Sequence, residues 1–188
     1  METPTRQRII EAARALFSER SWLGVPMGDI ADRVGISKPA LYHHFASKTE
    51  LYAVVMDQVA EDLRTRIVRA VGAATPAERL HRVVKDYLEF GVAEKNLVNA
   101  LVANPSPRDS ELRARVADSR RELEKHVQPV VEDVIAEHGL AITIDSGLLV
   151  ELLFAMMDGL LLGYSFWGKR VEPGCVADRM IEAFGLRR

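Results

Sequence analysis

The chain has very little cysteine: Cys175 is the only one in 188 residues, so no disulfide can form within it. With no resolving partner, Cys175 is expected to be a plain thiol rather than a redox sensor. The start of the chain lacks the basic and then apolar pattern of a secretory signal. We found no phosphate-binding glycine loop, metal-spaced His/Cys set, nucleophile elbow or dinucleotide fingerprint. These absences predict a cytoplasmic protein that is not an enzyme and needs no cofactor or metal.

Neither sign of charge is in large excess, because 25 Lys and Arg stand against 27 Asp and Glu, for a net charge of −2. The whole-chain balance therefore indicates no polyanionic partner. Residues 1–55 carry seven basic and six acidic side chains, which is compatible with DNA binding but common in soluble proteins. Hydrophobic residues make up 48% of the chain, as in ordinary globular proteins.

Strand signals are scarce, whereas helix signals recur along the chain and predict an all-α fold. Capping boxes at Ser47–Glu50 and Thr75–Glu78 each predict a helix start. Pro129 is expected to kink or divide one long helix, and residues 172–174 to form a turn. The expected helices are 4–20, 27–34, 37–44, a long one from 48 to the break at 72–75, 76–104, 109–139, 145–168 and 175–184.

Residues 27–45 have the pattern of a helix-turn-helix. Ala31 would let two helices approach closely, and Gly35 would accept the positive φ that the turn requires. Docking on DNA needs a second helix with a small, polar exposed face and its N-terminus toward the duplex. Four consecutive residues fit: the N-cap Ser37, the cation Lys38, Pro39 in the first turn and the small Ala40. The alternative is an ordinary two-helix hairpin of a helical bundle.

The stretch MGDIADRVGISKPALYHHFASKTELYAVV, preceded by RIIEAARALFSERSW, resembles the N-terminal domain of the TetR family of bacterial regulators, over about residues 5–57. The match is most specific from Ile36 to Glu50. The resemblance implies an N-terminal three-helix helix-turn-helix domain at 1–52 and a C-terminal helical effector-binding and dimerisation domain at 53–188. It also implies a homodimeric, ligand-responsive regulator, most often a repressor, that binds a palindromic operator in double-stranded DNA.

The resemblance assigns DNA contacts along the second helix of the motif. Bases or sugars would be touched by Lys38, Pro39 and Ala40, and phosphates by Tyr42, His43, His44 and Lys48. The family commonly has Ser or Thr before the first helix of the motif, whereas Pro26 stands there and has no donor. Either one phosphate contact fewer is expected there, or backbone amides of Met27 or Gly28 replace it. A metal site at the two histidines is disfavoured, because adjacent helical side chains point roughly 100° apart.

Residues 146–167 form the most apolar stretch, interrupted only by Glu151 and Asp158, which share one helical face. A transmembrane span is the competing interpretation, but such a span normally needs about 20 apolar residues without charges. Gly159 and Gly163 would let two helices approach closely. Because the last two long helices usually pair across the twofold axis in this family, the expected dimer contacts are Leu152, Ala155, Gly159, Leu162, Gly163, Phe166, Met180 and Phe184.

Methionine and aromatic side chains in the same region suit an adaptable apolar cavity for an apolar or amphipathic effector. The candidate liners, although residues of these types more often belong to a core or a dimer interface, are Tyr87, Phe90, Leu101, Phe154, Met156, Met157, Tyr164 and Trp167. The fourth helix, which leads from head to body, is expected to carry the effector's displacement to the DNA-binding segment. A non-sensing DNA-binding protein is the rival interpretation, disfavoured by a body longer than dimerisation requires.

Overall fold

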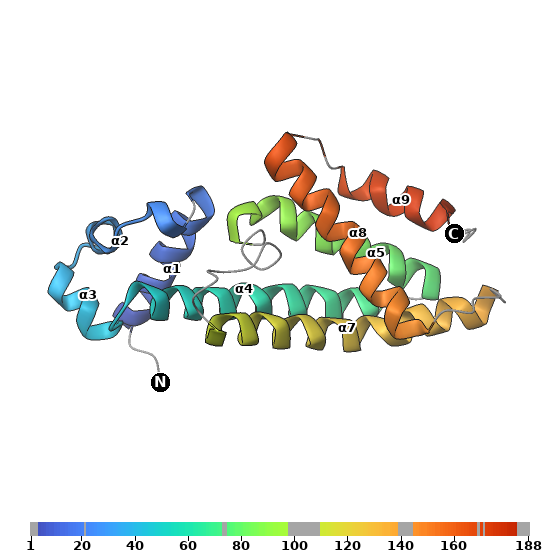
Figure 1. The fold of residues 1–188 in the computed structure, drawn as a ribbon, viewed down its shortest axis with the longest axis horizontal. Helices are drawn as coiled ribbons and strands as arrows, with labels where there is room; N and C mark the ends of the chain where they lie inside the picture. The colour runs from blue at the N-terminus through green and yellow to red at the C-terminus, as the bar shows by residue number, and fades with distance from the viewer. Residues whose placement is uncertain are drawn as a thin grey trace.

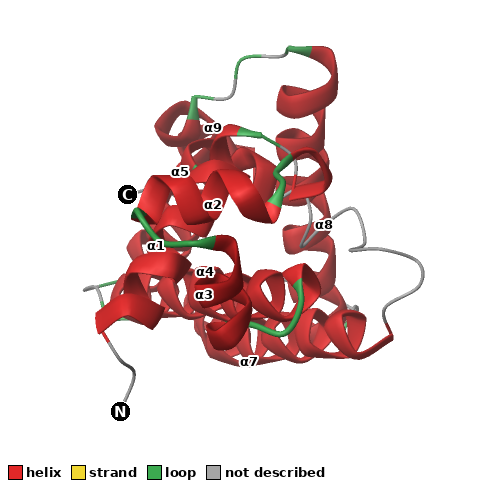
Figure 2. Cartoon of the chain, turned by 90° about the vertical axis from the view of Figure 1, so that its left-hand side faces the viewer, coloured by secondary structure: helices red, strands yellow, loops and turns green. Residues whose placement is uncertain are grey.

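The computed structural model of the protein describes residues 4–20, 22–72, 75–97, 110–138, 145–168, 170 and 172–183, without the side chains of 23, 110–113, 165 and 166. Every regular element in these ranges is helical, which confirms the expected fold class (Figure 2). The elements are α1 (Pro4–Glu19), a 3-10 turn (Trp22–Gly24), α2 (Met27–Val34), α3 (Lys38–His44), α4 (Lys48–Val71), α5 (Pro76–Ala93), α7 (Ser110–His138), α8 (Ser146–Trp167) and α9 (Pro173–Ala183).

The helices form a head and a body joined by α4 (Figure 1). The head consists of α1, α2, α3 and the first turns of α4, and the body of the rest of α4 with α5, α7, α8 and α9. In the body, α7 lies along α4, and α5 packs against α4, α7, α8 and α9. The expected boundary at residues 52 and 53 therefore falls inside a continuous helix.

The turn of the helix-turn-helix forms for the local reason that the sequence indicates. Gly35 adopts a left-handed conformation with φ of 78°, and its N–H donates to the carbonyls of Ala31 and Asp32. Ser37 then caps α3, because its side-chain oxygen accepts the N–H of Ala40 at 3.3 Å. The predicted bounds of both short helices are confirmed to within one residue.

The two expected capping boxes differ in their geometry. At the start of α5, Thr75 and Glu78 form both reciprocal hydrogen bonds, as expected. At the start of α4, Ser47 accepts the N–H of Glu50 at 3.1 Å, but the Glu50 carboxylate accepts from Ala46 at 2.7 Å instead of from Ser47. The reciprocal bond of the Ser47–Glu50 box is therefore made by the residue before the N-cap. Both helices nevertheless begin where the sequence predicts.

Three of the expected helix features differ in the structure. Helix α5 ends at Ala93 with a turn at Glu94, residues 95–97 are helical again, and the expected end near residue 104 lies outside the described residues. Pro129 does not divide α7, which is continuous from Ser110 to His138, and the neighbouring Val127 and Val130 are buried in the core. Pro173 starts α9, which fits its preference for the first helical position, so the last two residues of the turn expected at 172–174 belong to that helix.

Candidate functional site

The N-terminal part of α3 faces away from the protein. Leu41 and the following Phe45 are fully buried, which turns the opposite side of the helix outward. On that side Ser37, Lys38, Pro39, Tyr42 and His43 are exposed, and Ala40 and His44 are half-buried. The structure thus brings the DNA-contact candidates of this helix together on one outward surface.

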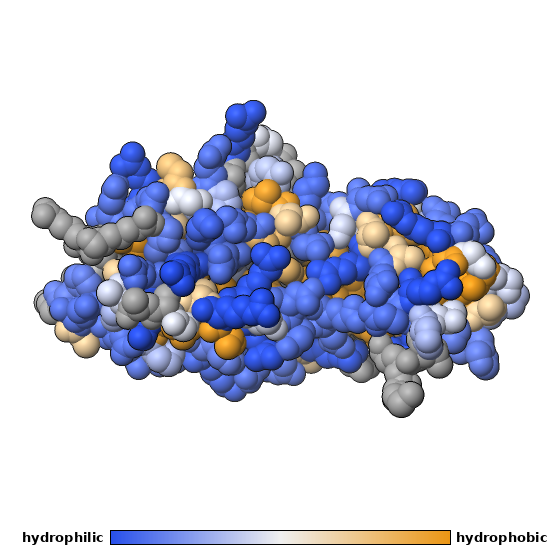
Figure 3. All heavy atoms as spheres, turned by 180° about the vertical axis from the view of Figure 1, so that it is seen from behind, coloured by the Kyte–Doolittle hydropathy of each residue, from blue (hydrophilic) through white to orange (hydrophobic). Residues whose placement is uncertain are grey.

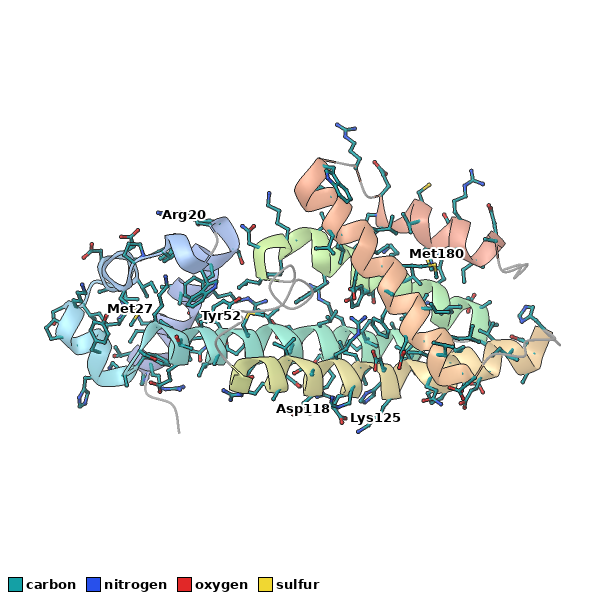
Figure 4. All side chains as sticks on the ribbon, in the orientation of Figure 1. Arg20, Met27, Tyr52, Asp118, Lys125 and Met180 are labelled. Atoms are coloured by element: carbon teal, nitrogen blue, oxygen red, sulfur yellow. The ribbon has the colours of Figure 1, made fainter. Side chains whose placement is uncertain are left out.

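The start of α2 differs from that surface. Pro26 is its N-cap and makes no side-chain capping bond. The Met27 side chain is only 5% exposed and lies in the head core, as Figure 4 shows, so only its backbone amide remains available for DNA. The Asp29 N–H is already used by the carbonyl of Pro26 at 3.2 Å.

Lys48, the phosphate-contact candidate at the first position of α4, is half-buried, and this burial lowers the pKa of its ammonium group. Its Nζ lies 5.1 Å from the centre of the Trp22 ring. Trp22 is a residue for which the sequence suggested no role. The sequence feature that could have pointed to Trp22 is its position as an aromatic residue shortly before the helix-turn-helix.

The His43 and His44 rings lie 5.8 Å apart at an interplanar angle of 71°. Over the described part of the chain, no three His, Cys, Asp or Glu side chains are grouped closely enough to hold a metal ion.

Polar side chains from α5, α7 and α8 meet at the edge of the body core, and we call them the polar cluster: Tyr87, Arg120, Glu124 and Asp158. Arg120 donates to Tyr87 Oη at 3.0 Å, to Asp158 Oδ2 at 2.8 Å and to Glu124 Oε1 at 3.0 Å. The Tyr87 hydroxyl donates to Asp158 Oδ1 at 2.5 Å. Burial and the Asp158 charge raise the pKa of Tyr87, so its hydroxyl keeps its proton and remains a donor.

The expected effector liners differ in how far they are buried. Tyr87, Phe90, Phe154 and Met157 are buried, and the Tyr87 and Phe154 rings meet edge to face at 5.2 Å. Tyr164 is half-buried, whereas Met156 and Trp167 are exposed. Leu101 lies outside the described residues. The structure thus brings the Tyr87 and Phe154 rings together, with the Tyr87 hydroxyl in the polar cluster. Met156 lies on the opposite, exposed side of α8.

An apolar surface lies along the outer side of α8, and we call it the α8 row. Its large side chains, Leu148, Leu152, Met156 and Leu160, are between 38% and 47% exposed. Ala155 and Gly159 are exposed between them, and a Cβ at Gly159 would meet no described atom within 4 Å. The face of the molecule seen from behind in Figure 3 is mostly hydrophilic.

The expected dimer contacts are only partly on this row. Leu152, Ala155 and Gly159 belong to it, Leu162 and Met180 are half-buried, and Gly163 is buried. The Phe166 side chain and Phe184 lie outside the described residues. Glu151 is exposed, whereas Asp158 is bound within the polar cluster, so the two acids do not form one solvated stripe. By length and hydropathy alone, residues 146–164 also suit a membrane span, a test that core helices of soluble proteins pass too.

A cavity of about 460 Å³ lies elsewhere, between α4 and α7, and none of the expected effector liners borders it. Its four carboxylates are each paired with a neighbouring cation: Asp57 with Arg115, Glu61 with Arg64, Asp118 with Arg121 and Glu122 with Lys125. The cavity therefore presents a neutralised, solvated surface.

Hydrogen bonds join the head to the end of α5. Arg14 of α1 donates to Asp62 of α4 at 2.5 Å and to Glu94 at 2.8 Å. Ser18 donates its hydroxyl proton to Glu94 at 2.6 Å, and Asn96 donates to the carbonyl of Ser18 at 2.6 Å. No sequence pattern indicates these contacts, which join residues far apart in the chain.

The fold and the outward α3 surface define a helix-turn-helix protein, and comparison with known families agrees. The profile described as "Bacterial regulatory proteins, tetR family" matches residues 9–55, and "Tetracyclin repressor-like, C-terminal domain" matches residues 73–184. The chain belongs to the TetR family and is a DNA-binding transcription regulator, as its resemblance implied. The family consists of transcription regulators rather than enzymes.

Three similar proteins illustrate the range of the family. The chain is 36% identical over 86 residues to the transcriptional activator FasR of Mycolicibacterium smegmatis, covering 45% of this chain and 39% of FasR. It is 25% identical over 175 residues to the nucleoid occlusion factor SlmA of Alteromonas mediterranea, covering 92% of this chain and 89% of SlmA. The crystal structure of FadR from Bacillus subtilis, in complex with stearoyl-CoA, superposes with a TM-score of 0.77 at 16% identity, covering 95% and 96% of the chains.

Proposed function

We propose that this regulator is a cytoplasmic homodimer that represses transcription from a palindromic operator and leaves the DNA when an apolar or amphipathic effector enters its body. The observation that carries the proposal is the outward face of α3, where Lys38 lies at the capped N-terminus and Tyr42 and His43 are exposed further along the helix. Such a face fits the major groove, because its first side chains reach base edges and its amides meet phosphates.

Selection of bound fragments from a random DNA pool tests this proposal. A twofold protein with two heads should enrich an inverted repeat whose half-sites lie about 34 to 36 Å apart. Lys38→Ala should relax the sequence preference, and Lys48→Ala should weaken binding to all sequences and flatten its salt dependence. Recovery of no common sequence by the wild-type protein would refute the operator-binding proposal.

The α8 row supports dimerisation, since it is an unusually apolar surface with an open approach at Gly159. A Cβ added at Gly159 meets no described atom of its own chain within 4 Å, so an effect of Gly159→Ala on assembly would indicate a contact with a second copy. We expect Leu152→Arg to give monomers in sedimentation velocity and to weaken operator binding. Val68→Arg is the matched control, because Val68 is similarly exposed but lies on α4. Dimers that survive Leu152→Arg unchanged would place the interface elsewhere.

The region between α5 and α8 is our candidate for the effector site. Tyr87, Phe154 and Met157 offer an apolar interior, and the polar cluster lies at its edge. The fold similarity to FadR, which was crystallised with stearoyl-CoA, supports an effector with a long apolar tail. Stearoyl-CoA is therefore the first probe: it should raise the melting temperature and lower operator affinity in the wild-type protein, and both effects should weaken in Phe154→Ala.

We propose that the effector signal reaches the head along two routes. One is α4 itself, and the other is the group of contacts from Arg14 and Ser18 to Glu94 and Asn96. Because Glu94 ends α5, a shift of that helix would pull directly on α1. Variants that lack these bonds should still bind operator DNA but should respond less to the effector.

A second candidate function is a DNA-binding protein that senses no small molecule. It is favoured by the similarity to SlmA over nearly the whole chain, since that relative is described as a nucleoid occlusion factor. The two candidates differ in one measurable property. A compound that both stabilises the protein and lowers its operator affinity supports the sensing regulator.

A further inference from the structure

The Lys48 side chain is held against an aromatic ring from a different segment. Its Nζ lies 5.1 Å from the centre of the Trp22 ring, within the range at which the negative face of an indole attracts a cation. Trp22 lies in the short 3-10 turn after α1, whereas Lys48 opens α4. The contact therefore connects the approach to α2 with the first turn of α4.

The Trp22 ring has a rigid support. It stacks on Tyr52 with ring centres 4.7 Å apart and an interplanar angle of 18°. Tyr52 in turn meets the Phe17 ring edge to face at 5.5 Å, and both of these side chains are almost fully buried. Figure 4 shows Tyr52 on α4 close to α1. Trp22 thus presents a fixed face to Lys48, and the stack ties that face to the head core.

We propose that Trp22 is a positioning residue for DNA binding, whose ring holds the Lys48 ammonium group by a cation–π contact in the place where it meets a phosphate. This proposal rests on the phosphate-contact role of Lys48 in the proposed function. A mobile lysine side chain loses rotamer entropy when it is ordered. If Trp22 already orders the Lys48 side chain, much of this entropy is lost on folding, and less is lost when DNA binds.

The start of α2 makes Lys48 more important in this chain. Pro26 replaces a residue type that can donate a hydroxyl hydrogen bond to phosphate, and it makes no side-chain cap. With one donor fewer at α2, a larger share of the phosphate contacts falls to the cation at the start of α4.

Operator titrations over a range of salt concentrations test the proposal with the full-length protein. Lys48→Met should reduce the slope of log affinity against log salt by about 0.9 for each head. Trp22→Leu should reproduce part of that reduction and weaken binding about 3- to 10-fold, while Trp22→Phe should retain most of the affinity. The double variant Trp22→Leu/Lys48→Met should bind no more weakly than Lys48→Met alone. Arg66→Met, which removes a cation held over the Phe90 ring in the body, is the matched control and should leave the slope unchanged.

A second measurement avoids any change of shape. The chain has two tryptophans, so fluorinated tryptophan labels Trp22 and Trp167 together. Fluorine weakens the negative face of the ring, and increasing fluorination should lower operator affinity stepwise in the wild-type protein. In Trp22→Phe, where Trp167 alone carries the label, fluorination should leave the operator affinity of that variant unchanged.

Fully additive losses in the double variant, or affinity insensitive to fluorination, would overturn the role of Trp22 and leave the regulator function intact. An unchanged salt slope in Lys48→Met would instead remove the phosphate contact on which the proposal rests. Failure of the wild-type protein to select any operator would refute the proposed function itself.

Discussion

The head and the body differ in the side chains that they present at their surfaces. In the head, the core is apolar and Lys38, Tyr42 and His43 point outward. In the body, Arg120 and Asp158 are bound to each other at the edge of the core, while the leucines and methionine of the α8 row face outward. The head thus presents a solvated polar surface that suits a polar partner. The body presents an apolar surface that is expected to be covered by a second apolar surface.

The comparison indicates different consequences for substitutions in the two regions. A polar side chain on the head surface contributes to DNA affinity and little to folding, because solvent already satisfies it. A polar side chain of the polar cluster contributes to folding, because its partners have left water for one another. Stabilities of head and body variants are compared at one fixed protein concentration.

The largest effect is expected for Arg120→Met in the body. The change leaves the Asp158 carboxylate, whose side chain is only 15% exposed, without its cation. We expect the free energy of unfolding to fall by about 3 kcal/mol in chemical denaturation. Arg120→Met/Asp158→Leu should recover more than half of the loss, since it also removes the stranded charge; a double variant as unstable as the single one would contradict this account. In the head, Lys38→Ala should change stability by less than about 0.5 kcal/mol.

Gly35→Ala should destabilise the head by about 1 to 2 kcal/mol, because a residue with a Cβ is strained at a φ of 78°. Thermal or chemical unfolding measures the loss. Gly28→Ala is the matched control: a Cβ there meets nothing within 4 Å and lies in an ordinary helical conformation, so stability should stay equal or rise. Equal losses in both variants would show that the left-handed turn is not the cause.

Arg14→Met tests the junction between the two regions and should cost about 1 kcal/mol, since it removes two partly exposed ion pairs. Hydrogen exchange should show faster opening at the end of α1. Arg33→Met provides the comparison within the head, because the Arg33–Glu19 pair is more exposed and should contribute almost nothing. If the two changes had the same effect, the contacts of Arg14 would not hold the head to the body.

The smallest effect is expected for Tyr52→Phe in the head. Among the described residues, the buried Tyr52 hydroxyl has no hydrogen-bond partner, so its removal should alter stability by less than about 0.5 kcal/mol, toward stabilisation. Tyr87→Phe in the body should instead cost about 1 to 2 kcal/mol, because that hydroxyl bonds to both Asp158 and Arg120. If the two variants had the same denaturation midpoint, the hydrogen bonds of the Tyr87 hydroxyl would contribute no more to stability than the Tyr52 hydroxyl does.

Sequence reasoning succeeded where a structure depends on neighbouring residues. Gly35, Ser37 and Thr75 act through bonds within a few positions, and their turn and caps form as predicted. It failed at Glu94, where α5 ends without a glycine or proline and where Arg14 and Ser18 bind the carboxylate. It also could not show that Asp158 would bind Arg120 while Glu151, on the same helical face, stays exposed, because helical spacing does not indicate which neighbour a side chain will meet.

Local sequence patterns were enough to predict the helical class, the helix-turn-helix and the exposed surface of α3, because caps, turns and apolar periodicity operate over one or two helical turns. The packing of the helices sets which polar groups pair across them, which side of α8 stays uncovered and which ring lies beneath Lys48. Those outcomes depend on how α1, α5, α7 and α8 pack, and distant segments come together only when the whole core is formed.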